Sequence, residues 1–260
     1  MKHTLGGSAL ACLVISTSLI LTSCGSSSDS DSSKDTSGSA EGSTTTPQPF
    51  NASGFLGGPA TPSFPDGDPD SISVVQIGPL DRDQVGSATL PIAFRNNTGE
   101  AVAHVDWTAT ARSGGSIVAT ASSQGTAPSQ IAPGEVGLAY IYFDNAEAIP
   151  DGVDYEFTAD SQPAGPTFFN TAPMTVTEVN IAGDAIVGSA TNATGEKTEG
   201  PYSVSVYCFD GDNLTSEIGT YAEQDGPIDA DGAVTFSARI YDDPCTNYIV
   251  GVSGYFSADD

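Results

Sequence analysis

The chain has 260 residues, with 33 Asp and Glu against 7 Lys and Arg, and a formal net charge of −26 at pH 7. Such a field repels phosphate backbones and anionic headgroups, so the charge argues against nucleic-acid binding and against adsorption of the folded part to a membrane surface. Gly, Ser, Thr, Ala and Asp are abundant and long amphipathic helical patterns are missing, which predicts an all-β protein with many turns.

The first 23 residues have the three parts of a secretory signal. Met1-Lys2-His3 is positively charged, and Ala9 to Leu21 is an apolar run too short for a membrane-spanning helix, which needs about 20 residues. Leu21-Thr22-Ser23-Cys24 follows and resembles the lipobox of bacterial lipoproteins. The resemblance implies cleavage before Cys24, attachment to Cys24 of a diacylglyceryl group and an N-acyl chain such as palmitate, and a lipid-anchored protein on the extracytoplasmic face of the cell membrane. The alternatives are an ordinary secretory signal or an uncleaved anchor.

Residues 24–69 are rich in Ser, Gly, Thr and Pro and predict a disordered tether, with a stiffer part after residue 46 that could partly dock. Asp66, Asp68 and Asp70 stand at alternate positions, as at the start of a calcium loop. The twelfth position of that loop is Ile77, where an EF-hand needs a bidentate Glu. We therefore treat the three as weak calcium candidates and favour a solvated turn.

An internal repeat organises the rest of the chain. Asn96-Asn97-Thr98-Gly99-Glu100 recurs as Asn192-Ala193-Thr194-Gly195-Glu196, and each copy lies between strand-like runs. The period of about 97 residues matches an immunoglobulin-like sandwich. The sequence thus predicts two tandem immunoglobulin-like antiparallel β-sandwiches, residues 70–161 and 172–260, as separately folding domains.

The interval between the predicted domains contains two prolines and the pair Phe168-Phe169. These phenylalanines are open to two interpretations: a final strand of the first domain or a hydrophobic contact between the domains.

Local patterns support the strands and turns. Ala103, Val105, Trp107 and Ala109 share one face of an alternating run, which predicts a half-buried strand with Trp107 in the core. The Asn-x-Thr-Gly elements also satisfy the glycosylation sequon, but hairpin turns are the interpretation we favour.

The second copy contains Val206-Tyr207-Cys208-Phe209-Asp210, followed by Gly211. With the preceding Asn-x-Thr-Gly turn, it resembles the FxLYD family, immunoglobulin-like modules of prokaryotic lipoproteins. The corresponding run of the first copy, Trp107 to Ala111, occupies the equivalent position in the repeat but does not have the residues of the motif. The resemblance implies extracytoplasmic modules without known catalysis, and it transfers no functional residues.

Four cysteines are present. Cys12 would leave with the signal and Cys24 would carry the lipid, so Cys208 and Cys245 remain as an even pair in an oxidising location. A disulfide between them is predicted; a metal or redox site lacks CxxC spacing and a nearby His.

No motif for catalysis or cofactor binding is found. His104 is the single histidine after the signal, and it stands beside Asp106 on the polar face of a strand, where we expect it to face solvent. A further set of acids, Asp225, Asp229, Asp231 and Asp242-Asp243, also reads as solvated turns.

The sequence therefore predicts a non-enzymatic cell-envelope lipoprotein, an interaction or structural module whose partner is an unidentified protein or cell-wall component. Its membrane contact would be the lipid alone, with no cofactor and no nucleic acid. The alternatives are a solute-binding lipoprotein serving a transporter and, less favoured, an envelope hydrolase.

Overall fold

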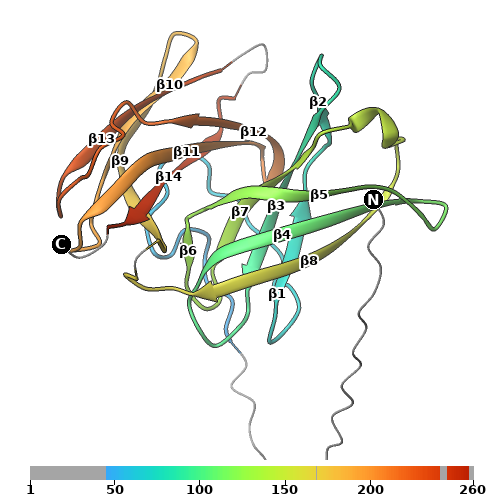
Figure 1. Ribbon diagram of the computed structural model, residues 1–260, viewed down its shortest axis with the longest axis horizontal. Helices are drawn as coiled ribbons and strands as arrows, with labels where there is room; N and C mark the ends of the chain where they lie inside the picture. The colour runs from blue at the N-terminus through green and yellow to red at the C-terminus, as the bar shows by residue number, and fades with distance from the viewer. Residues whose placement is uncertain (1–44, 168, 241–244, 258–260) are drawn as a thin grey trace, which may run out of the picture. The chain divides into compact units, whose positions relative to one another are not determined.

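The computed structural model describes residues 45–167, 169–240 and 245–257. The described chain is all-β, with two curled antiparallel sheets that form two β-sandwiches (Figure 1). The predicted fold class is confirmed. Alternating apolar residues and Gly-rich turns produce this architecture, because each strand has one side chain in two available for a core.

The first sandwich contains eight strands in the order β1-β3-β7-β5-β4-β6, with β2 added to β3 and β8 added to β4. Their bounds are β1 (Ile72–Ile77), β2 (Asp81–Arg82), β3 (Ala88–Asn96), β4 (Val102–Ser113), β5 (Ser116–Ala127), β6 (Gln130–Ile131), β7 (Val136–Phe143) and β8 (Asp154–Pro163), with a 3-10 turn at Ala146–Ala148. Trp107 is 2% exposed and packs against Phe94, with ring centroids 5.2 Å apart. The prediction that Trp107 is a core residue is confirmed.

The second sandwich has six strands in the order β12-β11-β14-β9-β10-β13. They are β9 (Thr171–Ala182), β10 (Ala185–Thr191), β11 (Thr198–Asp210), β12 (Asn213–Tyr221), β13 (Ala233–Arg239) and β14 (Tyr248–Phe256). β9 pairs with β14 through its first residues and with β10 through the rest, so it passes from one layer to the other. The predicted Cys208–Cys245 disulfide is present in the hydrophobic core of the second sandwich, with the two Cα atoms 5.3 Å apart.

The internal repeat is visible as equivalent turns. In the first copy, the fully buried Asn96 donates through Nδ2 to the carbonyls of Glu100 and Ile131, and its Oδ1 accepts from Thr98. In the second copy, Asn192 makes the same set with Glu196, Ile228 and Thr194. Each asparagine thus braces a turn and ties it to a distant loop, and its buried amide supports the turn interpretation of both motifs.

A third core lies between the two sandwiches. It joins Ala93, Val136 and Leu138 from the outer face of β3 and β7 to Tyr207, Phe209 and Ile249 from the outer face of β11 and β14. The backbones approach closely, because a Cβ on Gly251 would stand 2.6 Å from the Cβ of Ala127. Both faces of β3 and β11 are therefore covered, and the sandwiches share buried surface.

The sequence assigns residues 45–69 to a tether whose part after residue 46 could partly dock, and in the structure this segment is docked on the fold. This segment inserts Leu56, Ala60 and Phe64 into the third core, and Gly57 bridges Val250 of β14. The guanidinium of Arg95 is buried and donates to the carbonyls of Gln48, Phe64 and Pro65. A buried cation needs such partners, and this need explains why a polar segment is ordered here. Residues 24–44 lie outside the described part.

The two sandwiches are connected by residues 164–170. Phe169 is 67% exposed, so it belongs neither to a strand of the first sandwich nor to a buried plug. Phe168 lies outside the described residues. The connection is instead held by Asn170, whose Nδ2 donates to the carbonyls of Pro163 and Gly165.

Candidate functional site

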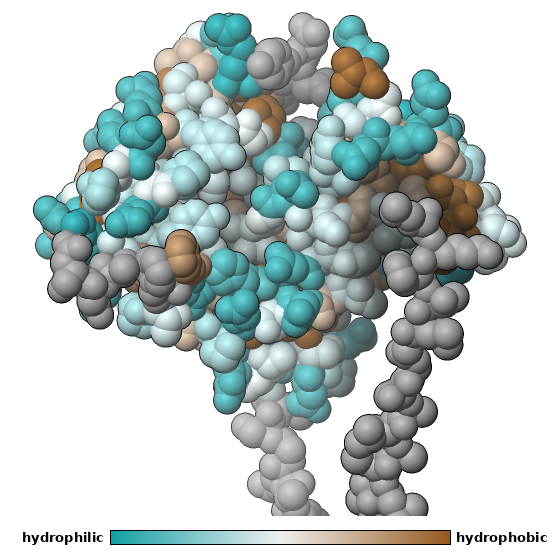
Figure 2. All heavy atoms as spheres, viewed as in Figure 1, coloured by the Kyte–Doolittle hydropathy of each residue, from teal (hydrophilic) through white to brown (hydrophobic). Residues whose placement is uncertain are grey.

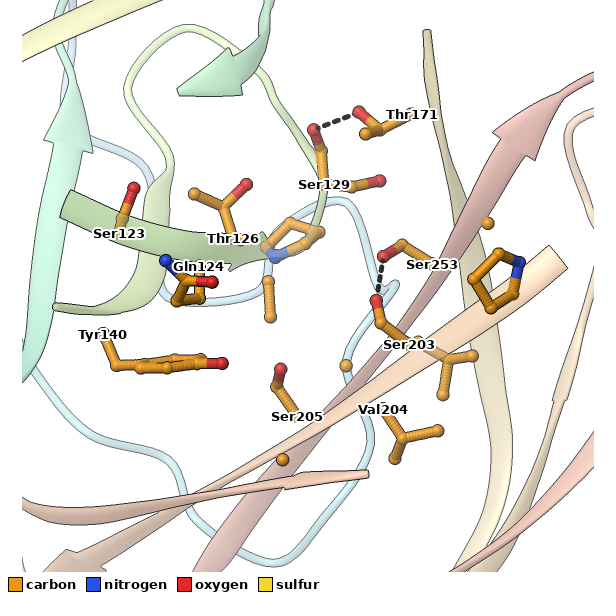
Figure 3. Close-up of a pocket in the computed structure, with 18 of the residues that line it drawn as sticks. Ser123, Gln124, Thr126, Ser129, Tyr140, Thr171, Ser203, Val204, Ser205 and Ser253 are labelled. Carbon is orange, nitrogen blue, oxygen red and sulfur yellow. Dashed lines mark hydrogen bonds between the residues drawn. The ribbon is translucent and has the colours of Figure 1, made fainter. Parts of the chain in front are cut away.

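A cleft of about 500 Å³ separates the two sandwiches on one side of the third core (Figure 3). One wall comes from β4, β5 and β7 of the first sandwich, and the other from β11, β12 and β14 of the second. Its volume lies within the range of about 300–1,000 Å³ that is usual for ligand sites. Because the third core connects the walls, the cleft is preformed by the fold.

Interruptions in the strands shape this cleft. The pairing of β4 with β8 shifts register between Ala103 and Asp106, and that of β5 with β7 shifts between Ser123 and Thr126. Gln124 and Gly125 bulge outward at the second shift and line the cleft. Such bulges redirect side chains and are common beside functional sites. Part of the site is therefore formed where the regular hydrogen-bonding pattern between neighbouring strands is interrupted.

Hydroxyl groups dominate the lining. Ser203 and Ser253 on neighbouring strands share a hydrogen bond of 2.9 Å, and Thr171 Oγ1 donates to the carbonyl of Ser129 at 3.1 Å. In Figure 3 the hydroxyl of Tyr140, from β7, points toward Ser205, from β11. Alternation along β11 places Ser203 and Ser205 on this outer face while Val204 and Val206 enter the core of the second sandwich.

Beside the cleft lies a polar cluster formed by Tyr140 and Glu217, which are half-buried, and by Tyr207, which is fully buried. Tyr207 and Glu217 are directly opposite each other on β11 and β12. Burial raises the pKa of the Glu217 carboxyl to about 8, and burial followed by the charge of Glu217 raises the pKa of Tyr140 to about 12. Among the described residues, Glu217 Oε1 is buried without a hydrogen-bond partner. The cluster holds unsatisfied hydrogen-bonding capacity beside the cleft.

Two of the residues singled out from the sequence, His104 and Asp106, line the cleft. His104 adopts a positive φ of 46°, which is uncommon for a residue other than glycine. Its Nε2 lies 3.1 Å from the carbonyl oxygen of Phe169. His104 is half-buried, because the shift in register of β4 lies beside it and its ring contacts the connection between the sandwiches, so the ring is only partly open to solvent.

The calcium candidates are exposed and do not converge. Asn97 Nδ2 donates to the backbone carbonyls of Asp66 and Asp68, and Asp68 N donates to Ser73 Oγ. Within the described ranges, no group of three His, Cys, Asp or Glu residues is arranged to hold a metal ion. Of the second acidic set, Asp242 and Asp243 lie outside the described residues, as does the lipidation candidate Cys24.

No protein-family model and no curated protein matches the sequence. In the part of the chain that the structure describes, no helix is long and apolar enough to span a membrane.

The cleft residues other than His104 and Asp106 were missed by the sequence analysis. One signal was available: Tyr207 and Phe209 follow Ser203 and Ser205 on the same face of β11, so that face changes from polar to aromatic along the strand. A strand that is apolar on both faces at one end must be covered there on both sides.

Proposed function

We propose that this protein is a lipid-anchored, extracytoplasmic binding protein without enzymatic activity, and that its ligand enters the cleft between the two sandwiches. The observation that carries the proposal is a preformed, hydroxyl-lined cleft whose walls are connected by a buried core. Convergent polar groups in the best-formed pocket are the usual mark of a binding site.

The location rests on the amino terminus and on the cysteines. The sequence from Leu21 to Cys24 resembles a lipobox, and the Cys208–Cys245 bond is of a kind that persists in oxidising compartments. An acylated Cys24 would supply the membrane contact, because the net charge of −26 keeps the folded part away from anionic headgroups.

A binding role fits the chemistry of the lining better than catalysis does. Acyl transfer needs a nucleophile within hydrogen-bond reach of a base. The imidazole of His104 is engaged with the carbonyl of Phe169, and the hydroxyls of Ser203 and Ser253 are paired with each other. This arrangement positions a ligand without activating a hydroxyl.

Solute capture for a transporter is the second candidate, because the cleft lies between two units as in proteins of that class. Such capture commonly uses hinge closure around the ligand. Here Leu138 and Tyr207 are fully buried between the sandwiches, and closure would have to break that contact. The shared core therefore favours a rigid binding module.

Site-specific photo-crosslinking in the producing cells tests the proposal. Gln124 is exposed and lines the cleft, whereas Ser116 is exposed at the β4–β5 hairpin away from it. A benzophenone side chain at position 124 should give a discrete adduct that is absent from the variant labelled at position 116. Equal adducts from both positions, or none from position 124, would overturn the cleft as the binding site.

A further inference from the structure

The cleft differs from the rest of the molecule in its charge. The chain carries 33 acidic residues, and strongly hydrophilic residues are spread over the face seen in Figure 2. Among the described residues that line the cleft, however, the ionisable groups other than tyrosine are His104 and Asp106. The lining contains no Lys or Arg to bind an anionic ligand, and the surrounding negative field repels such a ligand. The charge of the molecule and of the lining therefore argues against an anionic occupant.

The hydrogen-bonding groups of the lining favour a ligand that both donates and accepts. Eleven of the twenty-four lining residues carry a hydroxyl, which serves in both roles. Ser129 Oγ is buried at this lining, and it has no hydrogen-bond partner among the described residues. Tyr221 and Tyr255 also line the cleft, with exposed fractions of 65% and 38%. Their rings offer flat apolar faces with a polar edge.

A glycine opens the cleft toward the polar cluster. A Cβ on Gly219 would stand 3.3 Å from Glu217 Oε1 and 3.9 Å from the Tyr140 hydroxyl. Gly219 lines the cleft and lies directly opposite Ser205 on β11. A ligand hydroxyl that occupies the space of the missing side chain therefore comes within reach of the Glu217 carboxyl and the Tyr140 hydroxyl. A protonated carboxyl at Glu217 both donates and accepts, as recognition of a hydroxyl requires.

We propose that the cleft binds a neutral oligosaccharide, with one sugar hydroxyl at Gly219 between Tyr140 and Glu217. This inference rests on the proposed function and names the ligand class of the same cleft. Polyhydroxylated rings match the lining because their hydroxyls pair with serine and tyrosine side chains while their C–H faces pack on the tyrosine rings. A peptide backbone offers one donor and one acceptor per residue at fixed places, whereas each sugar hydroxyl both donates and accepts, as the lining hydroxyls do.

Titration calorimetry on the purified full-length protein tests the ligand class. The probes are neutral hexasaccharides of glucose, mannose, xylose and N-acetylglucosamine, with hexagalacturonate as the anionic counterpart. At least one neutral probe should bind, and hexagalacturonate should bind at least ten-fold more weakly. Absence of binding by every neutral probe at millimolar concentration, or tighter binding of hexagalacturonate, would overturn the inference.

A pair of glycine variants locates the site. Neither Gly219 nor Gly226 has a positive φ, and a Cβ on Gly226 would meet nothing within 4 Å. G219V should weaken binding of the neutral probe at least ten-fold, while G226V should bind as the parent does; both should retain the parent's melting temperature within a few degrees. If G219V melts much lower, S205A provides a second comparison, because it removes the lining hydroxyl directly opposite Gly219. Unchanged binding in a folded G219V or S205A variant would refute this placement.

The crosslinking experiment separates the two levels of the proposal. A protease-sensitive adduct at position 124, together with no binding of neutral sugars, would leave the cleft as the binding site and refute the sugar class. An adduct at position 124 that resists protease and is lost on glycosidase treatment supports both.

Discussion

The buried carboxyl of Glu217 makes a quantitative prediction about stability and pH. Its pKa is about 8 in the folded protein against an ordinary value of 4.5, because burial disfavours the charged form. The groups that face it are the phenols of Tyr207 on β11 and Tyr140 on β7, so no cation compensates the charge when the proton leaves.

The direction and size follow from proton linkage. The folded state holds the proton more tightly than the unfolded chain, so the stabilisation is fully present below about pH 4.5 and is lost as pH rises to about 8. A difference of about 3.5 pH units corresponds to roughly 5 kcal/mol as an upper bound, with a slope of about 1.4 kcal/mol per pH unit between the two values.

Urea unfolding from pH 5 to 8.5 measures this effect. Between pH 5.5 and 7.5 the wild-type protein should lose up to about 2.7 kcal/mol relative to E217Q, which has no proton to release. E178Q removes an exposed carboxyl from β9 and should follow the wild-type profile. Carbon NMR of the carboxyl should show a signal that titrates near pH 8 and disappears in E217Q. Parallel profiles for wild type and E217Q would refute the burial argument.

Four further outcomes are expected. N192A should lower the unfolding free energy by about 2–4 kcal/mol in urea titrations, because buried carbonyls lose their donor. R95L should make residues 45–65 sensitive to limited proteolysis, because their carbonyls lose the buried guanidinium. Reducing the disulfide should cost up to about 4 kcal/mol and add two hydrogens to the intact mass, since the bond closes a loop of 37 residues. C24A should abolish labelling by a palmitate analogue and release the protein from membranes; retention with an unchanged amino terminus would indicate an uncleaved anchor.

The strands and turns could be predicted because their signals are local. Alternation from Ala103 to Ala109 identifies the buried face of β4 without knowledge of what covers it. The asparagines at positions 96 and 192 brace their turns through contacts to residues two and four positions away, in addition to a distant loop. Short-range chemistry of this kind is written in the sequence itself.

The sequence left a partial docking of the part after residue 46 open, but the place and the contacts of residues 45–65 could not be predicted in this way. The carbonyls that receive the Arg95 guanidinium lie 30 to 47 residues away in sequence. A Ser- and Pro-rich segment is disordered in isolation. Here the buried guanidinium of Arg95 binds its carbonyls and the outer faces of the two sandwiches cover its apolar side chains, and these contacts order the segment. An arginine inside an apolar strand is a further hint in the sequence that distant partners exist.

By itself, the sequence determined the all-β class, the repeat, the disulfide pair and the core position of Trp107. Period-two alternation and turn residues are local signals, and the cysteine count leaves a single pair after the signal and the lipidation site are set aside. The tertiary structure decided which polar faces meet water and which meet another sheet. Ser205 and Tyr207 are two residues apart and lie on the same face of β11. Ser205 nevertheless lines a cleft, whereas Tyr207 is fully buried. Burial of an outer face depends on the surface that a distant part of the chain brings against it, and no local pattern encodes that.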